Sequence, residues 1–159
     1  MLASNSTTDT IRFFLLWVKG ASPAVRPAVI MTDCDKAQIA ALQDVYPHSR
    51  IFLCTWHVLR AMRSHFATNE FPVLWEKIKT WVKTDKMAEF QQISDEIFSD
   101  PLIPQSLVQY LATDWLPMSH LWSRTARKNR SIFEEGDTNM LIEAYVISAD
   151  FCDKITDLI

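Results

Sequence analysis

The chain has 159 residues, an apolar share of 48% and two glycines, which predicts one helix-rich globular unit and favours it over a disordered protein. Its net charge of −3 argues against a strong sequence-independent grip on nucleic acid, so any DNA contact has to come from a local basic patch. Three cysteines far apart in the sequence suggest no disulfide framework and indicate a reducing compartment.

The first predicted element is a helix over residues 11–19. Apolar residues occupy nearly all of its faces, so we expect it to pack between other elements. Ser22-Pro23 and Arg26-Pro27 end it. Its apolar run over residues 13–18 is shorter than the about 20 residues of a membrane span. We therefore expect neither a signal peptide nor a transmembrane segment.

Residues 27–63 are predicted to alternate between strand and helix. Two short apolar runs, 28–32 and 50–54, have the composition of buried strands, and a helical pattern lies between them. Strands joined through a helix pair in parallel, so their carboxyl ends should meet at one edge of the sheet. Open α/β sheets carry their sites at such edges.

A turn with two aspartates follows the first strand. Asp35 and Gln38 resemble a capping box, in which Asp35 accepts amide hydrogens of the next helix and Gln38 reaches back. If Asp35 caps the helix, Asp33 is left for other chemistry. From spacing alone, the simpler interpretation of Asp33 is also a helix cap.

Cys54 and His57 flank the turn after the second strand, and Thr55 is expected to cap the helix that follows. Parallel pairing would place this turn beside Asp33. The two residues have the spacing of half a zinc site, but a structural zinc site needs four ligands and no second close pair exists. Zinc is therefore not favoured. A buried cysteine, and a histidine bonded to backbone or phosphate, fit better.

Residues 72–130 are predicted to be all helical because apolar residues recur every three or four positions. One helix begins at Pro72, and Pro104 starts another. Between these two lies a helix expected to face inward with Met87, Phe90, Ile93 and Ile97. We expect a turn at 114–117 and a short helix from Leu121. Trp75 and Trp81 have core spacing and are interpreted as packing residues.

A basic cluster lies at the end of this helical region, beside Trp122. Arginine suits bidentate contacts to phosphate, so these residues are the candidate DNA contacts: Arg124, Arg127, Lys128 and Arg130. Gly136 and Thr138 then break and cap the chain, which places Glu143 in the second turn of a new helix. From spacing alone, Glu143 is a solvated helix residue.

Three motifs, in this order, resemble the MULE-type (Mutator-like element) transposases in the variety found in fungal genomes: MTDCDKAQIAAL, VYPHSRIFLCTWHVLR and SIFEEGDTNMLIEAY. The resemblance spans residues 11–145. It implies an α/β fold with a partial ribonuclease-H-like core, interrupted by an all-helical insertion. It also implies an Asp-Asp-Glu site that holds Mg²⁺ and cuts and joins transposon DNA ends in the nucleus.

Matched position by position, Asp33 corresponds to the second catalytic Asp and Glu143 to the final Glu, and these two would hold the metal. Cys54 and His57 correspond to the Cys-x-x-His signature, with His57 assisting at the DNA end. The implied division is a partial core over 1–66, an insertion over 67–135, and a final helix with a divergent tail over 136–159.

Two departures from the family lead us to expect a fragment that is inactive by itself. Nothing before Ile11 resembles the strand that carries the first Asp, and the sequence after Tyr145 diverges. Two alternatives remain open. The chain is a non-catalytic module that binds DNA or protein through the helical insertion, or it is a degenerate gene product without a stable fold. The sequence also leaves open whether the chain forms an oligomer and whether a partner completes the sheet.

Overall fold

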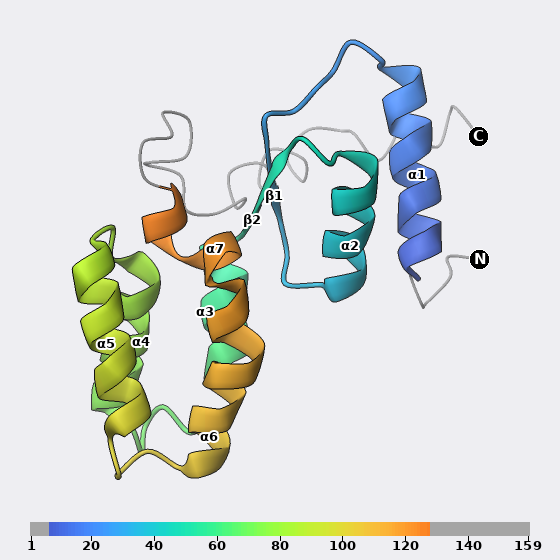
Figure 1. Cartoon of the computed structure of the whole chain (residues 1–159). Coiled ribbons are helices and arrows are strands. Elements are labelled where there is room, and N and C mark those ends of the chain that lie inside the picture. The colour runs from blue at the N-terminus through green and yellow to red at the C-terminus, as the bar shows by residue number, and fades with distance from the viewer. Residues whose placement is uncertain (1–6, 128–159) are drawn as a thin grey trace, which may run out of the picture.

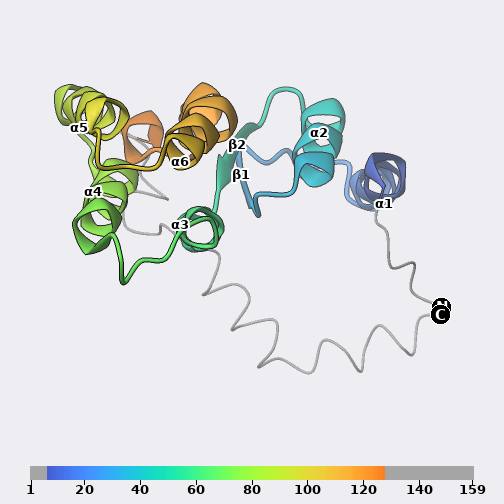
Figure 2. The ribbon, with the colours of Figure 1, turned by 90° about the horizontal axis from the view of Figure 1, so that it is seen from below.

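The computed structural model describes residues 7–127. The elements lie in successive layers, with α1 and α2 on one side of a small sheet and helices α3 to α7 on the other (Figures 1 and 2). The helical lobe on the second side contains most of the buried apolar residues. Among residues 7–127 no helix is long and apolar enough to cross a membrane.

Helix α1, Thr8–Ala21, begins where Thr7 accepts a hydrogen bond from the amide of Thr10. It packs against α2, and none of its residues is buried. The expectation that α1 packs between several elements is wrong for the described part of the chain. Four large apolar residues of α1 are exposed: Phe13, Phe14, Leu16 and Trp17.

The sheet consists of β1, Val29–Thr32, and β2, Arg50–Leu53, which pair in parallel. Helix α2, Lys36–Val45, connects them, so the predicted strand, helix and strand are confirmed. The register pairs Thr32 with Leu53, and both strands therefore end at the same edge. The fold is α/β in this sense, with helix as its main component.

The remaining helices follow from α3, Thr55–Arg63, onward. They are α4 (Pro72–Lys83), α5 (Met87–Ser99), α6 (Gln105–Tyr110), a π-helical turn η1 (Leu111–Trp115), a 3₁₀ turn η2 (Leu116–Met118), α7 (Ser119–Trp122) and a 3₁₀ turn η3 (Arg124–Arg127). The prediction of helices from Pro72 is confirmed as far as Arg127. Our prediction of a turn at 114–117 is wrong, because Pro117 lies in the first turn of η2, where its missing amide costs no hydrogen bond.

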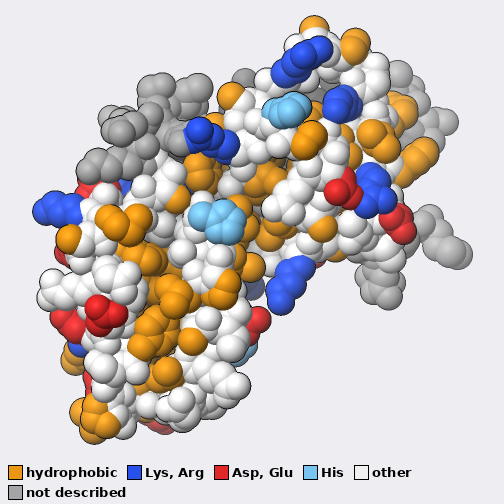
Figure 3. Space-filling model, in the orientation of Figure 1, with side chains coloured by type: hydrophobic (Ala, Val, Ile, Leu, Met, Phe, Trp, Pro, Cys, Tyr) orange, Lys and Arg blue, Asp and Glu red, His pale blue; other side chains and the backbone are white. Residues whose placement is uncertain are grey.

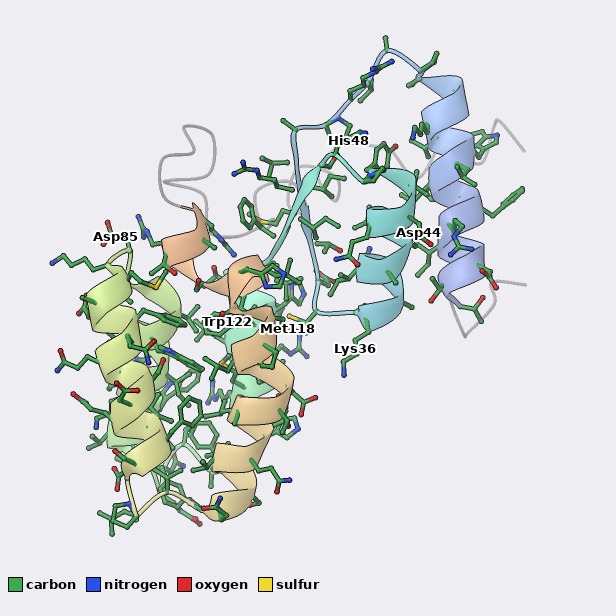
Figure 4. The ribbon with its side chains drawn as sticks, in the orientation of Figure 1. Lys36, Asp44, His48, Asp85, Met118 and Trp122 are labelled. Carbon is green, nitrogen blue, oxygen red and sulfur yellow. The ribbon has the colours of Figure 1, made fainter. Side chains whose placement is uncertain are left out.

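Aromatic side chains fill the centre of the helical lobe. Trp81 of α4 and Trp122 of α7 are fully buried, with ring centroids 4.8 Å apart, and Trp122 points from α7 toward α4 and α5 (Figure 4). The indole of Trp81 donates to Ser94 Oγ over 2.8 Å, which satisfies its one polar atom. Trp75 is partly buried against the same core. Both residues predicted as packing residues, Trp75 and Trp81, are confirmed in that role.

In helix α5, the spacing of apolar residues correctly predicts which side chains are buried within the helix but not at its first residue. Phe90, Ile93 and Ile97 are buried as predicted, whereas Met87 is 63% exposed. The prediction that Met87 faces inward is wrong because Met87 is the first residue of α5, one turn beyond the part that packs on α4.

Replacing Ile97 by Ala should lower the free energy of unfolding by about 2–5 kcal/mol, because a fully buried side chain leaves a cavity. Met87→Ala on the same helix is the matched control and should change it by less than about 0.5 kcal/mol. Urea unfolding followed by circular dichroism measures both. Equal losses in the two variants would contradict the described packing of α5.

Candidate functional site

The turn after β1 assigns different tasks to its two aspartates. Asp35 is the N-cap of α2 and accepts a hydrogen bond from the amide of Gln38 over 2.9 Å. The side chain of Gln38 does not return to Asp35 as a capping box would require. It accepts instead from the hydroxyl of Thr32 over 2.5 Å. Asp35 is therefore occupied by the helix, and Asp33 is not.

Asp33 lies against the first turn of α3. Its Oδ1 is 2.9 Å from Nδ1 of His57, with 47% of the Asp33 side chain and 22% of the His57 side chain exposed. Nδ1 is enclosed, and its direction does not meet the geometry of a hydrogen bond. The contact is therefore an ion pair whenever the imidazole is protonated. The structure thus brings together the two residues, from separate turns, that the sequence placed side by side.

Cys54 joins the two turns through its backbone. Its amide donates to the carbonyl of Thr32 over 2.8 Å, and its side chain is fully buried. Cys54, rather than Thr55, is the N-cap residue of α3, and it provides no side-chain hydrogen bond. The expectation that Thr55 caps α3 is wrong, because the hydroxyl of Thr55 accepts from Arg127 instead.

Cys34 lies in the turn after β1, and burial together with the nearby Asp33 carboxylate raises the pKa of its thiol to about 12. Cys34 and Cys54 are both free thiols. A thiol with so high a pKa is protonated at neutral pH and is a poor nucleophile or metal ligand. The chemistry of the described site therefore lies with Asp33 and His57.

Sequence reasoning missed an exposed aromatic residue next to His57. The ring of Trp56 meets that of His57 edge-on, with centroids 4.8 Å apart, and the guanidinium of Arg60 lies 5.0 Å from the Trp56 ring centroid. Trp56 is 43% exposed. Its position four residues before Arg60 was the available signal, since residues with that spacing are neighbours on a helix.

Arg127 lies in the protein interior, although the sequence placed it among the candidate DNA contacts. Only 2% of Arg127 is exposed. Its guanidinium donates to the carbonyl of Leu53 and, over 3.3 Å, to the hydroxyl of Thr55, and it lies 5.5 Å from the Phe52 ring centroid. Arg127 thus anchors η3 to the end of β2 and is not presented to a DNA phosphate in this structure.

Of the other candidate site residues, the structure describes only one. Arg124 is partly buried in η3. Lys128, Arg130 and Glu143 lie outside the described residues.

Residues 1–61 match the family model described as the MULE transposase domain. This segment is part of a MULE transposase domain. The match covers α1, the β1-α2-β2 unit and α3 as far as Ala61, and thus includes Asp33, Cys54 and His57. No curated protein and no solved structure matches the chain.

The described residues offer few ligands for a divalent ion. Among residues 7–127 there is no group of three or more His, Cys, Asp or Glu side chains able to hold a metal. Asp35 is engaged in capping, so the edge of the sheet offers one carboxylate, from Asp33, and one imidazole. Mg²⁺ prefers oxygen ligands. The described residues therefore do not form a complete magnesium site, and the MULE domain needs further donors for one.

Replacing Arg127 by Ala should lower the free energy of unfolding by about 2–4 kcal/mol, because the Leu53 carbonyl and the Thr55 hydroxyl lose a donor that is shielded from water. The exposed Arg26 provides the control, and Arg26→Ala should change stability by less than about 0.5 kcal/mol. Urea unfolding measures both. An Arg127 variant as stable as the Arg26 variant would exclude the anchoring role.

Cys34 should resist alkylation, since the thiolate is the reactive form. At about pH 8 iodoacetamide should modify it at least about tenfold more slowly in the folded chain than in concentrated urea, because folding raises its pKa. Asp33→Asn should speed the reaction of the folded chain by removing a nearby negative charge. Peptide-resolved mass spectrometry gives the rates, and equal rates with and without urea would show the thiol to be unprotected.

Proposed function

We propose that this chain is the part of a MULE transposase catalytic domain that supplies Asp33 and His57 to the cutting and joining of DNA ends. The observation that carries the proposal is the 2.9 Å contact between these two side chains at the paired strand ends, within the segment that matches the family. The parallel β1-α2-β2 unit supports a partial ribonuclease-H-like core, with the helices after α3 as an insertion.

The chemistry of DNA cleavage explains why such a pair is useful. Attack on a phosphodiester needs an activated water or 3′-hydroxyl and a stabilised leaving oxygen, which divalent ions held by carboxylates supply in two-metal sites. Asp33 is one such carboxylate, and Glu143 is proposed as another. The Asp33 carboxylate lies against Nδ1 of His57, which leaves Nε2 to contact a phosphate oxygen of the DNA end.

The 159-residue chain alone is proposed to bind DNA without cutting it. Of the Asp-Asp-Glu set, the sequence offers Asp33 and Glu143, and removal of one member of a catalytic unit commonly abolishes most of the rate. The second proposed function is a DNA-binding module without catalysis. The nucleus is the proposed place of action, since it holds the DNA substrate.

A binding experiment tests whether DNA lies at the Asp33 edge. In EDTA, Asp33→Asn should tighten binding of a fluorescein-labelled oligonucleotide by about two- to fivefold, because the carboxylate repels phosphate. Asp85 lies where α4 and α5 are joined (Figure 4). Asp85→Asn removes the same charge there and should leave the affinity nearly unchanged. Fluorescence anisotropy gives both dissociation constants. A chain that binds no DNA, or two variants with equal affinity, would overturn the proposal.

Cutting is assayed on supercoiled plasmid with Mg²⁺ in the same preparations. We expect no nicking by the chain alone. Nicking that disappears in the Asp33→Asn variant would show that the chain is a complete nuclease and that only its proposed inactivity is wrong.

A further inference from the structure

The outward side of α3 carries aromatic and positive side chains together. Trp56, Arg60 and Arg63 are exposed and recur at helical spacing; we call them the α3 outer face. The opposite side of α3 is fixed in the core by Val58 and Met62, both fully buried. The α3 outer face is therefore held rigidly by the fold and directed away from the core.

The charge of the α3 outer face is not cancelled within its own helix. Helix α3, Thr55–Arg63, contains no acidic residue, although the whole chain has a net charge of −3. On the face drawn in Figure 3, Lys and Arg side chains are scattered, with Asp and Glu side chains between them. The described residues on that face therefore form no uniform basic surface.

Trp56 adds an exposed apolar ring to the positive charge of the α3 outer face. A large aromatic ring that is 43% exposed keeps apolar surface in water unless a ligand covers it. The guanidinium of Arg60 lies over the Trp56 ring, 5.0 Å from its centroid, so a base resting against the part of the ring that Arg60 leaves exposed would have a cation beside it for its own phosphate. Aromatic rings with adjacent cations are the usual features of sites for unpaired nucleic acid strands.

The α3 outer face lies next to the Asp33–His57 pair. Trp56 contacts His57 edge-on at 4.8 Å between centroids, and His57 contacts Asp33. We propose that the α3 outer face binds an unpaired DNA strand beside the Asp33–His57 pair, with a base against Trp56 and phosphates at Arg60 and Arg63. This inference rests on the proposed function and names the form of DNA that the site takes.

An unpaired strand fits this surface better than duplex DNA. In a duplex the base faces are stacked on each other and are not offered to a side chain, whereas a single strand exposes them. Two arginines alone would bind either form through phosphates. Preference for the unpaired strand therefore isolates the contribution of Trp56.

The test measures anisotropy of a labelled single-stranded oligonucleotide with the full chain over a range of salt concentrations. Trp56→Ala should raise the dissociation constant by about 5- to 100-fold, the effect of losing one stacked base. Arg60→Gln should flatten the plot of log K against log salt by about 0.7, the value for one phosphate contact to a single strand. Unlabelled single strand should compete better than duplex of equal length.

Matched controls come from exposed residues away from the Asp33 edge. Trp17 is 65% exposed on α1, and Arg26 is exposed in the loop before β1, so Trp17→Ala and Arg26→Gln should bind as the wild type does. Thermal unfolding verifies that every variant is folded. A chain that binds no DNA overturns both this inference and the proposed function. DNA binding that responds to Asp33→Asn but not to Trp56→Ala or Arg60→Gln overturns this inference alone.

Discussion

The parallel pairing of β1 and β2 is the constraint on which the rest of the site depends. Because Thr32 is paired with Leu53, the two strands end at the same level and their following residues are forced together. The amide of Cys54 reaches back to the carbonyl of Thr32 over 2.8 Å, which extends the pairing by one more bond. A shift of register by one residue would reverse the faces of one strand and separate Asp33 from His57.

The helical lobe supports this edge through a buried cation. The family match ends at residue 61, within α3, and the helices from α4 onward lie outside it. Their last described turn returns Arg127 to the carbonyl of Leu53 and the hydroxyl of Thr55. The buried guanidinium thus couples the packing of α7 and η3 to the strand end that precedes His57. A substitution that disturbs the packing of the helical lobe would therefore also affect the Asp33 edge, although it lies in another part of the structure.

The sequence was most informative where periodicity or capping chemistry acts locally. The strands, the cap by Asp35 and the start of α4 at Pro72 followed from such signals. Tertiary context decided the rest. In the sequence, an arginine cluster before Glu143 is typical of exposed residues. Nothing in the neighbouring sequence indicates that Arg127 points into the core, where it donates to a backbone carbonyl group. Likewise Pro117 signals a break, yet the chain stays helical around it by passing through π and 3₁₀ turns.

Asp33 and Asp35 have different roles because of their positions in the turn between β1 and α2. An N-cap side chain must lie immediately before the first helical residue to reach the amide three positions on, and Asp35 precedes Lys36, where α2 begins. Asp33 is two residues earlier and cannot make that bond. It also directly follows Thr32, at the end of β1, so its carboxylate remains at the sheet edge. The helix start therefore selects which carboxylate is left facing His57.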